Sequence, residues 1–197
     1  KTGLKMKNIA IFASGSGSNA ENIIRYLNTA HGDDLRVSVV VCNRPEARVI
    51  ERARNLGVPV EVLTKAEIND PERMMEVLDS HAVDGIVLAG FLLMIPSFLI
   101  GRYDGRIINI HPSLLPKYGG KGMYGIHIHR AVVENREKET GITVHLVTDR
   151  CDEGQIIFQT NVAVAPEDTP EDVERKIHAL EKEHFPQVVK EHFTAPA

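Results

Sequence analysis

The sequence predicts an α/β fold built on a mostly parallel β-sheet. Up to residue 110, short apolar segments rich in β-branched residues alternate with amphipathic segments of helical spacing, which is typical of consecutive βαβ units. After Pro112 the pattern changes to two neighbouring strand-like segments and one long helical segment. We therefore expect a Rossmann-like sheet flanked by helices, with antiparallel late strands and a C-terminal helix.

Each expected element has its own local signal. Strands are expected where apolar and β-branched residues cluster, over residues 8–13, 36–42, 58–63, 85–90, 106–110, 141–147 and 155–164. Helices are expected where apolar residues recur at helical spacing, over residues 20–27, 47–57, 71–81 and 129–134. A last helix is expected to begin at Pro170, with Thr169 as its cap.

The most apolar stretch covers residues 85–100 and resembles a short membrane span. It contains two glycines and a proline, and it is shorter than the ~20 residues that a spanning helix needs. We therefore expect a buried strand, a turn and a short helix in this stretch.

Composition limits the classes of protein to consider. With 197 residues, of which 43% are hydrophobic and 25% charged, the chain fits a single globular domain over residues 1–197. The net charge of -4 argues against nucleic acid or an anionic membrane as a partner. Cys42 and Cys151 form no CxxC pair, which indicates a reducing, cytoplasmic setting. The apolar run near the start is too short for a signal peptide. Composition does not set the oligomeric state.

Asn109 and His111 stand at the end of the expected strand 106–110, directly before Pro112. Side chains alternate along a strand, so these two would project from the same face. Proline cannot donate to a sheet ladder, and the strand should therefore stop there. Ligands bind at the carboxyl ends of strands in open α/β sheets. The alternative is a buried pair of polar residues that hydrogen-bond to neighbouring backbone, and the pattern leaves both interpretations open.

A glycine-rich turn lies between the first expected strand and the first helix. Gly15, Gly17 and Ala20 match the pattern G-x-G-x-x-A, and glycines before a helix let backbone amides approach a phosphate. The alternative is a tight turn in which Ser or Asn caps the helix. A dinucleotide site would need an acidic residue after the second strand, but Asn43 and Arg44 stand there. This argues against NAD, while Arg44 keeps an NADP-binding reductase as an alternative.

Residues 147–157 form an acidic turn between the two late strands, with Asp149, Asp152 and Glu153. Such a turn is usually solvated. The functional alternative places one carboxylate beside His111, where it would orient the ring and favour the imidazolium.

Histidines are numerous, but their spacing does not predict a metal site. His127 and His129 begin a helical pattern, in which residues two apart diverge. No Cys/His set has zinc spacing. We therefore expect no metal cofactor.

Five segments together carry a family resemblance. "SGSGSN", "VLAGFLLMI", "NIHPSLLPKY", "TVHLVTD" and "DEG" occur in this order, and the chain resembles the phosphoribosylglycinamide formyltransferases of the folate-dependent formyltransferase family. The resemblance implies transfer of a formyl group from 10-formyltetrahydrofolate, a co-substrate, to the amine of glycinamide ribonucleotide in purine biosynthesis. It also implies that the N-terminal part binds the nucleotide phosphate and the C-terminal part the folate.

Other functions stay open alongside this one. Methionyl-tRNA formyltransferases share the His-Pro-Ser-Leu-Leu-Pro element but carry a further C-terminal domain, which we do not expect here. The main alternative is a formyltetrahydrofolate hydrolase, although those enzymes usually have an N-terminal regulatory domain. An NADP-binding reductase and a non-catalytic binding module are weaker alternatives.

The resemblance also assigns individual residues. The implied catalytic residues are Asn109, His111 and Asp152: the amide and the protonated ring would stabilise an oxyanion, while Asp152 would help to move protons. The implied ribonucleotide ligands are Gly17, Ser18 and Asn19 at the phosphate, with Glu181 in the last helix. The implied folate contacts are Leu92, Leu93, Met94, Ile95, Asn109, Thr148 and Asp149.

The chain departs from the family pattern in two places. The segment Gly119–Gly125 is longer than the usual link, and its role is open. No basic residue over 68–71 matches the group that would hold the folate's glutamate tail.

Overall fold

The sheet has the predicted mixed character. In a computed structural model, described for residues 6–29 and 33–195, seven strands follow the order β3-β2-β1-β4-β5-β6-β7. β1 is parallel to β2 and β4, and β2 is parallel to β3, whereas β6 and β7 are antiparallel. The strands are β1 (Lys7–Ala13), β2 (Leu35–Cys42), β3 (Val60–Val62), β4 (Gly85–Leu88), β5 (Ile107–His111), β6 (Glu139–Leu146) and β7 (Ile156–Ala163).

Helices separate the parallel strands, as the alternating pattern predicts. The helices are α1 (Ser18–Leu27), α2 (Arg48–Asn55), α3 (Lys65–Ile68), α4 (Pro71–Ser80), α5 (Ser97–Arg102), α6 (Ile126–Glu134) and α7 (Pro170–Thr194). The predicted strand, turn and short helix over 85–100 are confirmed by β4 and α5. The short helix α3 was not predicted, although Thr64 and Glu67 form a capping box at its start. No helix within the described ranges is long and apolar enough to cross a membrane.

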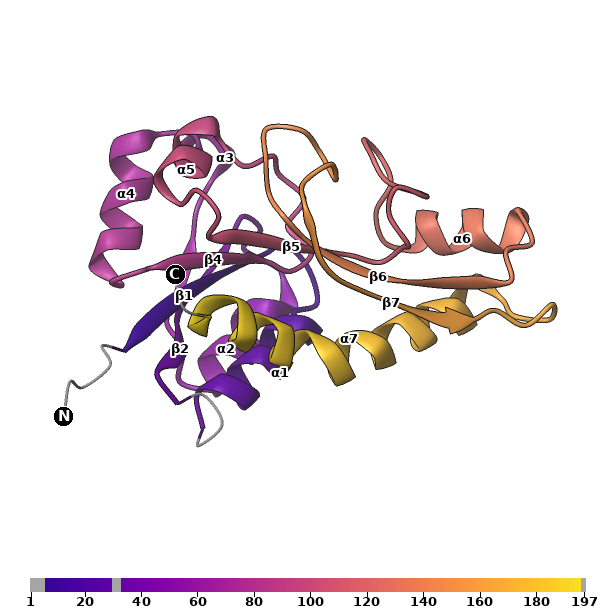
Figure 1. Ribbon diagram of the computed structural model, residues 1–197. Coiled ribbons are helices and arrows are strands. Elements are labelled where there is room, and N and C mark those ends of the chain that lie inside the picture. Colours follow the sequence, from indigo (N-terminus) through magenta and orange to yellow (C-terminus); the bar gives the residue numbers. More distant parts are fainter. Residues whose placement is uncertain (1–5, 30–32, 196–197) are drawn as a thin grey trace. The chain divides into compact units, whose positions relative to one another are not determined.

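The chain divides into two compact units. The first comprises Lys1–Ile108 and Pro186–Ala197, and the second is Asn109–Phe185. In the first unit, α1 and α2 lie on one face of the sheet, and α4 and α5 lie on the other (Figure 1). The central strand β1 is accordingly buried from Asn8 to Ala13, as expected for a parallel strand covered on both faces.

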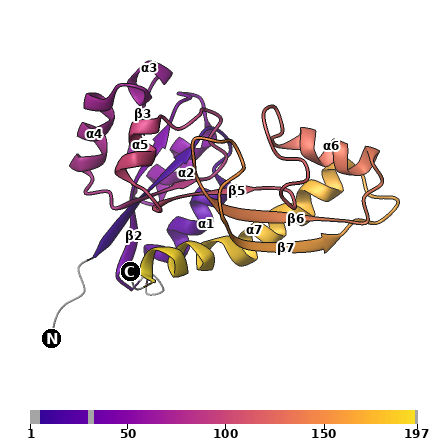
Figure 2. The same cartoon turned by 45° about the horizontal axis from the view of Figure 1, so that its top comes forward.

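The second unit contains the antiparallel pair. Figure 2 shows β6 and β7 side by side along their length. β6 is buried from Thr140 to His145, whereas β7 alternates between half-buried and exposed residues, as befits the last strand of the sheet. α7 begins at Pro170 as predicted, because Thr169 and Asp172 exchange side chain–backbone hydrogen bonds at its start.

The glycine-rich turn brings α1 and α2 into close contact. Gly17 has φ 78° and stands at the N-cap of α1, where no side chain caps the helix. The alternative in which Ser or Asn caps this helix is therefore wrong. A Cβ at Gly17 would lie 2.5 Å from Cγ2 of Val49 in α2, and the Val49 amide donates to the Gly15 carbonyl at 3.1 Å. Glycine is thus required here by backbone conformation and by packing.

Gly17→Ala is expected to lower the free energy of unfolding by about 2 kcal/mol or more, because it adds left-handed strain to overpacking. Gly15→Ala is the matched control, since a Cβ there has no atom within 4 Å. Denaturant unfolding of both variants measures the difference. Equal, small losses would contradict the packing assigned to Gly17.

The two histidines at the start of α6 diverge, as predicted. His127 is exposed, whereas His129 is buried and its Nδ1 has no hydrogen-bond partner among the described residues. Burial and, to a smaller extent, the charge of nearby His178 together lower the pKa of His129 from 6.5 to about 4. Across residues 6–29 and 33–195, no group of three or more His, Cys, Asp or Glu side chains is arranged to hold a metal ion.

Burial of neutral His129 predicts sensitivity to acid. Because its folded-state pKa lies below 6.5, the stabilisation is complete above that pH and is lost as the pH falls from 6.5 through 4. Between pH 7.5 and pH 5 the loss should be about 2 kcal/mol. His129→Leu should reduce the measured pH dependence by about this amount and His127→Leu should leave it unchanged, as measured by unfolding at both pH values. Equal pH dependence in the two variants would refute this origin.

Candidate active site

Two predicted site residues project from the end of β5. Strand β5 ends at His111, directly before Pro112, so Asn109 and His111 share one face of the strand, as alternation requires. His111 is 5% exposed, and Asn109 is half-buried. The Asn109 amide lies against His145 and the His111 ring against Asp152, and these two neighbours lie 3.7 Å apart. The predicted strand end is confirmed.

Asp152 reaches His111 from the turn between β6 and β7. Its carboxylate Oδ1 lies 3.5 Å from Nδ1 of His111, and its Oδ2 accepts a hydrogen bond from the Gly120 amide at 2.9 Å. Asp152 has φ 56°, a conformation that non-glycine residues adopt chiefly where the surroundings hold them. Asp149 and Glu153 are exposed. Asp152 therefore differs from the other two carboxylates of the acidic turn, because it lies beside His111 and is not exposed.

The hydrogen-bond partner of His111 fixes the role of each ring nitrogen. Nε2 lies 2.9 Å from the Tyr118 carbonyl, and a carbonyl oxygen only accepts, so Nε2 carries a hydrogen. Nδ1 faces Asp152 at 3.5 Å, which is longer than the about 2.7–2.9 Å of a charge-assisted hydrogen bond. Nδ1 is therefore the ring nitrogen that remains available to interact with a substrate.

His145 completes the cluster, and sequence reasoning missed it. Its Nδ1 donates to the Leu146 carbonyl at 2.9 Å, and its Nε2 lies 3.1 Å from Nδ2 of Asn109. Since an amide nitrogen donates, Nε2 must accept, and the ring is neutral. Burial lowers the pKa of His145, and His111 also lowers it. The available signal was a single histidine inside the apolar run "GITVHLV".

Asn109 is oriented by this neutral ring. One hydrogen of its Nδ2 goes to His145, which leaves the second hydrogen for a ligand. Asp152 Oδ1 lies 3.7 Å from His145 Nε2. The amide of Asn109, Nδ1 of His111 and the carboxylate of Asp152 therefore converge, and together they offer two donors beside one acceptor.

The first unit brings other predicted residues to the carboxyl ends of its strands. The buried Ser14 hydroxyl donates to Asn43 Oδ1 at 2.5 Å and accepts from the Leu92 amide at 3.0 Å. It thereby links the turns that follow β1, β2 and β4. Gly17 is buried in the first of these turns, and Ser18 and Asn19, the first two residues of α1, are half-buried.

The predicted folate contacts include exposed apolar side chains. Leu92 is 46% and Met94 61% exposed in the segment after β4, whereas Ile95 is buried and Leu93 is half-buried. Large apolar side chains that stay exposed often mark a binding surface.

The remaining predicted contacts lie in the second unit. Thr148 and Asp149 are exposed in the acidic turn, and Thr148 exchanges hydrogen bonds with the backbone of Arg150. Glu181 lies in α7 and is 8% exposed. Such burial is unusual for a carboxylate and indicates a specific environment.

Comparison with known proteins identifies the family. Residues 7–189 match the family described as formyl transferase. Phosphoribosylglycinamide formyltransferase of Bacillus subtilis is 38% identical over 94% of this chain and 94% of that relative. The chloroplastic phosphoribosylglycinamide formyltransferase of Arabidopsis thaliana is 40% identical over 91% of this chain, which spans only 62% of that relative. The crystal structure of phosphoribosylglycinamide formyltransferase from Bacillus halodurans superposes with a TM-score of 0.84, at 35% identity over 96% of each chain. The chain belongs to the formyl transferase family.

Proposed function

We propose that this chain transfers the formyl group of 10-formyltetrahydrofolate to the amine of glycinamide ribonucleotide, a step of purine biosynthesis. The observation that carries the proposal is the convergence of Asn109, His111 and Asp152 at the end of β5. Support also comes from the names of the relatives, which are phosphoribosylglycinamide formyltransferases.

The two donors suit the charge that develops during formyl transfer. When the amine attacks the formyl carbon, the carbonyl oxygen becomes the oxyanion of a tetrahedral intermediate. The free hydrogen of Asn109 Nδ2 and Nδ1–H of the protonated His111 ring would both point at this oxygen. Donors that are oriented in advance lower the barrier by about 3 kcal/mol each in a water-poor site.

Asp152 would move the protons that the reaction requires. The attacking amine must lose one proton, and the folate nitrogen must gain one as its bond to the formyl carbon breaks. Asp152 Oδ1 lies 3.5 Å from Nδ1 of His111 and 3.7 Å from Nε2 of His145, which holds Asn109, so it can take the proton from the amine. The protonated His111 ring beside it can then supply the leaving nitrogen.

Substrate binding follows the family pattern. We assign the ribonucleotide phosphate to Gly17, Ser18 and Asn19 at the start of α1, where the helix N-terminus favours an anion. We also assign Glu181 to the ribonucleotide. The folate is assigned to Leu92, Leu93, Met94 and Ile95 with Asn109, Thr148 and Asp149. The proposed chemistry uses no metal.

The same donors and carboxylate would also suit attack by water, which would make the protein a formyltetrahydrofolate hydrolase. An assay that follows folate product with glycinamide ribonucleotide present and absent distinguishes the two functions. We expect product only with the ribonucleotide. Equal turnover without it would establish the hydrolase, and no turnover in either case would refute both functions.

Asn109→Ala and His111→Ala are each expected to lower kcat by about a hundredfold or more, because each removes a donor from the developing charge. The dissociation constant of the ribonucleotide should change little in both variants, and that of the folate should change little in His111→Ala, since the donors act mainly on the transition state. Steady-state kinetics and calorimetric titration measure the two effects. Near-normal kcat in either variant would mean that Asn109 and His111 have a structural role and not a catalytic one.

Asp152→Asn should lower kcat at least as strongly, because the amide cannot accept the amine proton. The substitution should preserve the fold, since asparagine also tolerates positive φ and keeps an oxygen for the Gly120 amide. Glu153→Gln is the matched control, because this side chain is exposed in the same turn and has no assigned ligand. A similar loss of kcat in Glu153→Gln would contradict the role of Asp152 in the mechanism.

A further inference from the structure

The backbone of Tyr118, Gly119 and Gly120 spans the His111–Asp152 pair. The Tyr118 carbonyl accepts from Nε2 of His111 at 2.9 Å, and the Gly120 amide donates to Asp152 Oδ2 at 2.9 Å. One short segment therefore holds both proposed catalytic side chains. Its position determines which atoms of His111 and Asp152 are left to act on a substrate.

Tyr118 needs support to hold this position. Its φ is 56°, in the left-handed region that disfavours residues with a Cβ by about 1–2 kcal/mol. Such a conformation persists where surrounding contacts impose it.

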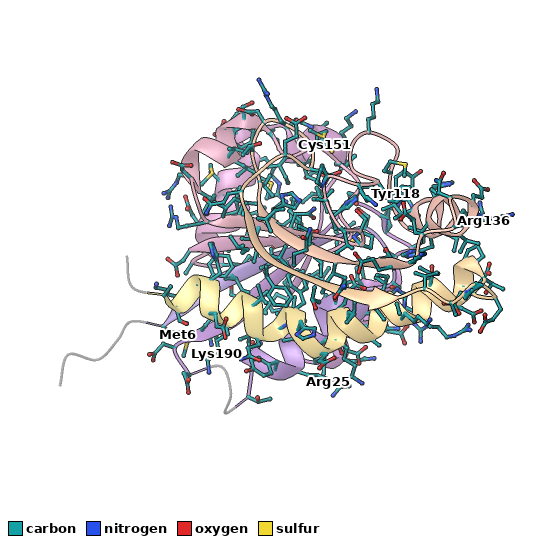
Figure 3. The ribbon with its side chains drawn as sticks, turned by 45° about the vertical axis from the view of Figure 1, so that its right-hand side comes forward. Met6, Arg25, Tyr118, Arg136, Cys151 and Lys190 are labelled. Carbon is teal, nitrogen blue, oxygen red and sulfur yellow. The ribbon has the colours of Figure 1, made fainter. Side chains whose placement is uncertain are left out.

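The support comes from Glu137, 19 residues later in the chain. The Tyr118 hydroxyl donates to Glu137 Oε1 at 2.8 Å, and Lys117 Nζ lies 3.4 Å from Oε2. Figure 3 shows Tyr118 between Cys151 and Arg136, which precede Asp152 and Glu137 in the chain. Burial raises the pKa of the Tyr118 phenol, and the Glu137 carboxylate also raises it, so the phenol keeps its hydrogen and stays a donor.

We propose that Tyr118 and Glu137 are positioning residues. They orient the His111 ring so that Nδ1, and not Nε2, is the nitrogen that acts on the substrate. Glu137 accepts a hydrogen bond from the Tyr118 hydroxyl, and this hydrogen bond keeps the Tyr118 carbonyl in position to accept from Nε2–H of His111. With Nε2 occupied, the ring presents Nδ1 to Asp152 Oδ1. A hydrogen bond to one imidazole nitrogen sets the role of the other. Without it, rotation of the ring would exchange the two nitrogens.

Tyr118→Phe tests this assignment, because it removes the hydroxyl and keeps the ring and the carbonyl. In the parent chain labelled with nitrogen-15 histidine, Nε2–H of His111 should give a proton resonance that is protected from exchange with water. His111→Gln identifies this resonance. Tyr118→Phe and Glu137→Ala should abolish the protection, whereas Tyr124→Phe, an exposed tyrosine nearby, should retain it.

Kinetics supply the second readout, which rests on the proposed function. Tyr118→Phe and Glu137→Ala should each lower kcat by about tenfold with KM nearly unchanged, because a small misplacement of a catalytic group slows the chemical step. Glu137→Gln keeps an oxygen for the hydroxyl and should recover most of the rate. The double variant should be no worse than the poorer single variant, since both act through one contact.

Two results would overturn the proposal. One is a protected Nε2–H resonance that persists unchanged in Tyr118→Phe. The other is an equal loss of rate in Glu137→Gln and Glu137→Ala, which would exclude the hydroxyl bond as the cause. The resonance is measured without substrates, so a parent chain that lacks formyl transfer would refute the proposed function and leave the positioning role to be decided by NMR.

Discussion

The hydrogen bond from Nε2 of His111 to the Tyr118 carbonyl is the contact on which the candidate site depends. At 2.9 Å it fixes which nitrogen carries a hydrogen, and it thereby fixes which nitrogen faces Asp152. The acceptor is a backbone atom, so its position is set by the path of the chain after β5 and by the contacts that hold that path. The Gly120 amide, two residues later, holds Asp152 in the same way. Backbone geometry thus orients two side chains whose chemistry requires accurate placement.

His111 and His145 lie within one cluster but have opposite hydrogen-bonding roles. His145 is buried, donates from Nδ1 to the Leu146 carbonyl and accepts from Asn109 through Nε2, so it serves as a neutral orienting group. His111 has the Asp152 carboxylate on one side and the Tyr118 carbonyl on the other, and both partners suit a ring that donates from both nitrogens. Local partners, not residue type, therefore distinguish the histidine that we propose to be catalytic from the one that orients Asn109.

The sequence predicts the frame of the fold better than its details. Alternating apolar and amphipathic segments predict the parallel strands and the helices between them, and Pro112 correctly marks the end of β5. The four-residue helix α3 is not predicted, because it is too short to show a helical period. The glycine pattern predicts a phosphate loop, but it does not reveal that Gly17 must also leave space for Val49 of α2.

The site is predictable only in part, for a similar reason. Strand alternation alone places Asn109 and His111 on one face. The choice of Asp152 over Asp149 and Glu153 requires the family resemblance, because all three carboxylates look alike in a polar turn. Contacts between distant segments, such as the bond from Tyr118 to Glu137, leave no local pattern. His145 was missed because an apolar strand predicts burial and does not predict a polar partner.

The most direct test of the central claim is a crystal structure of the protein with an inhibitor that joins the ribonucleotide to a folate through a tetrahedral carbon bearing a hydroxyl. The account predicts that this oxygen lies about 3 Å from both Asn109 Nδ2 and His111 Nδ1, while Nε2 still donates to the Tyr118 carbonyl. An oxygen bound to Nε2, with the Tyr118 carbonyl displaced, would contradict the account.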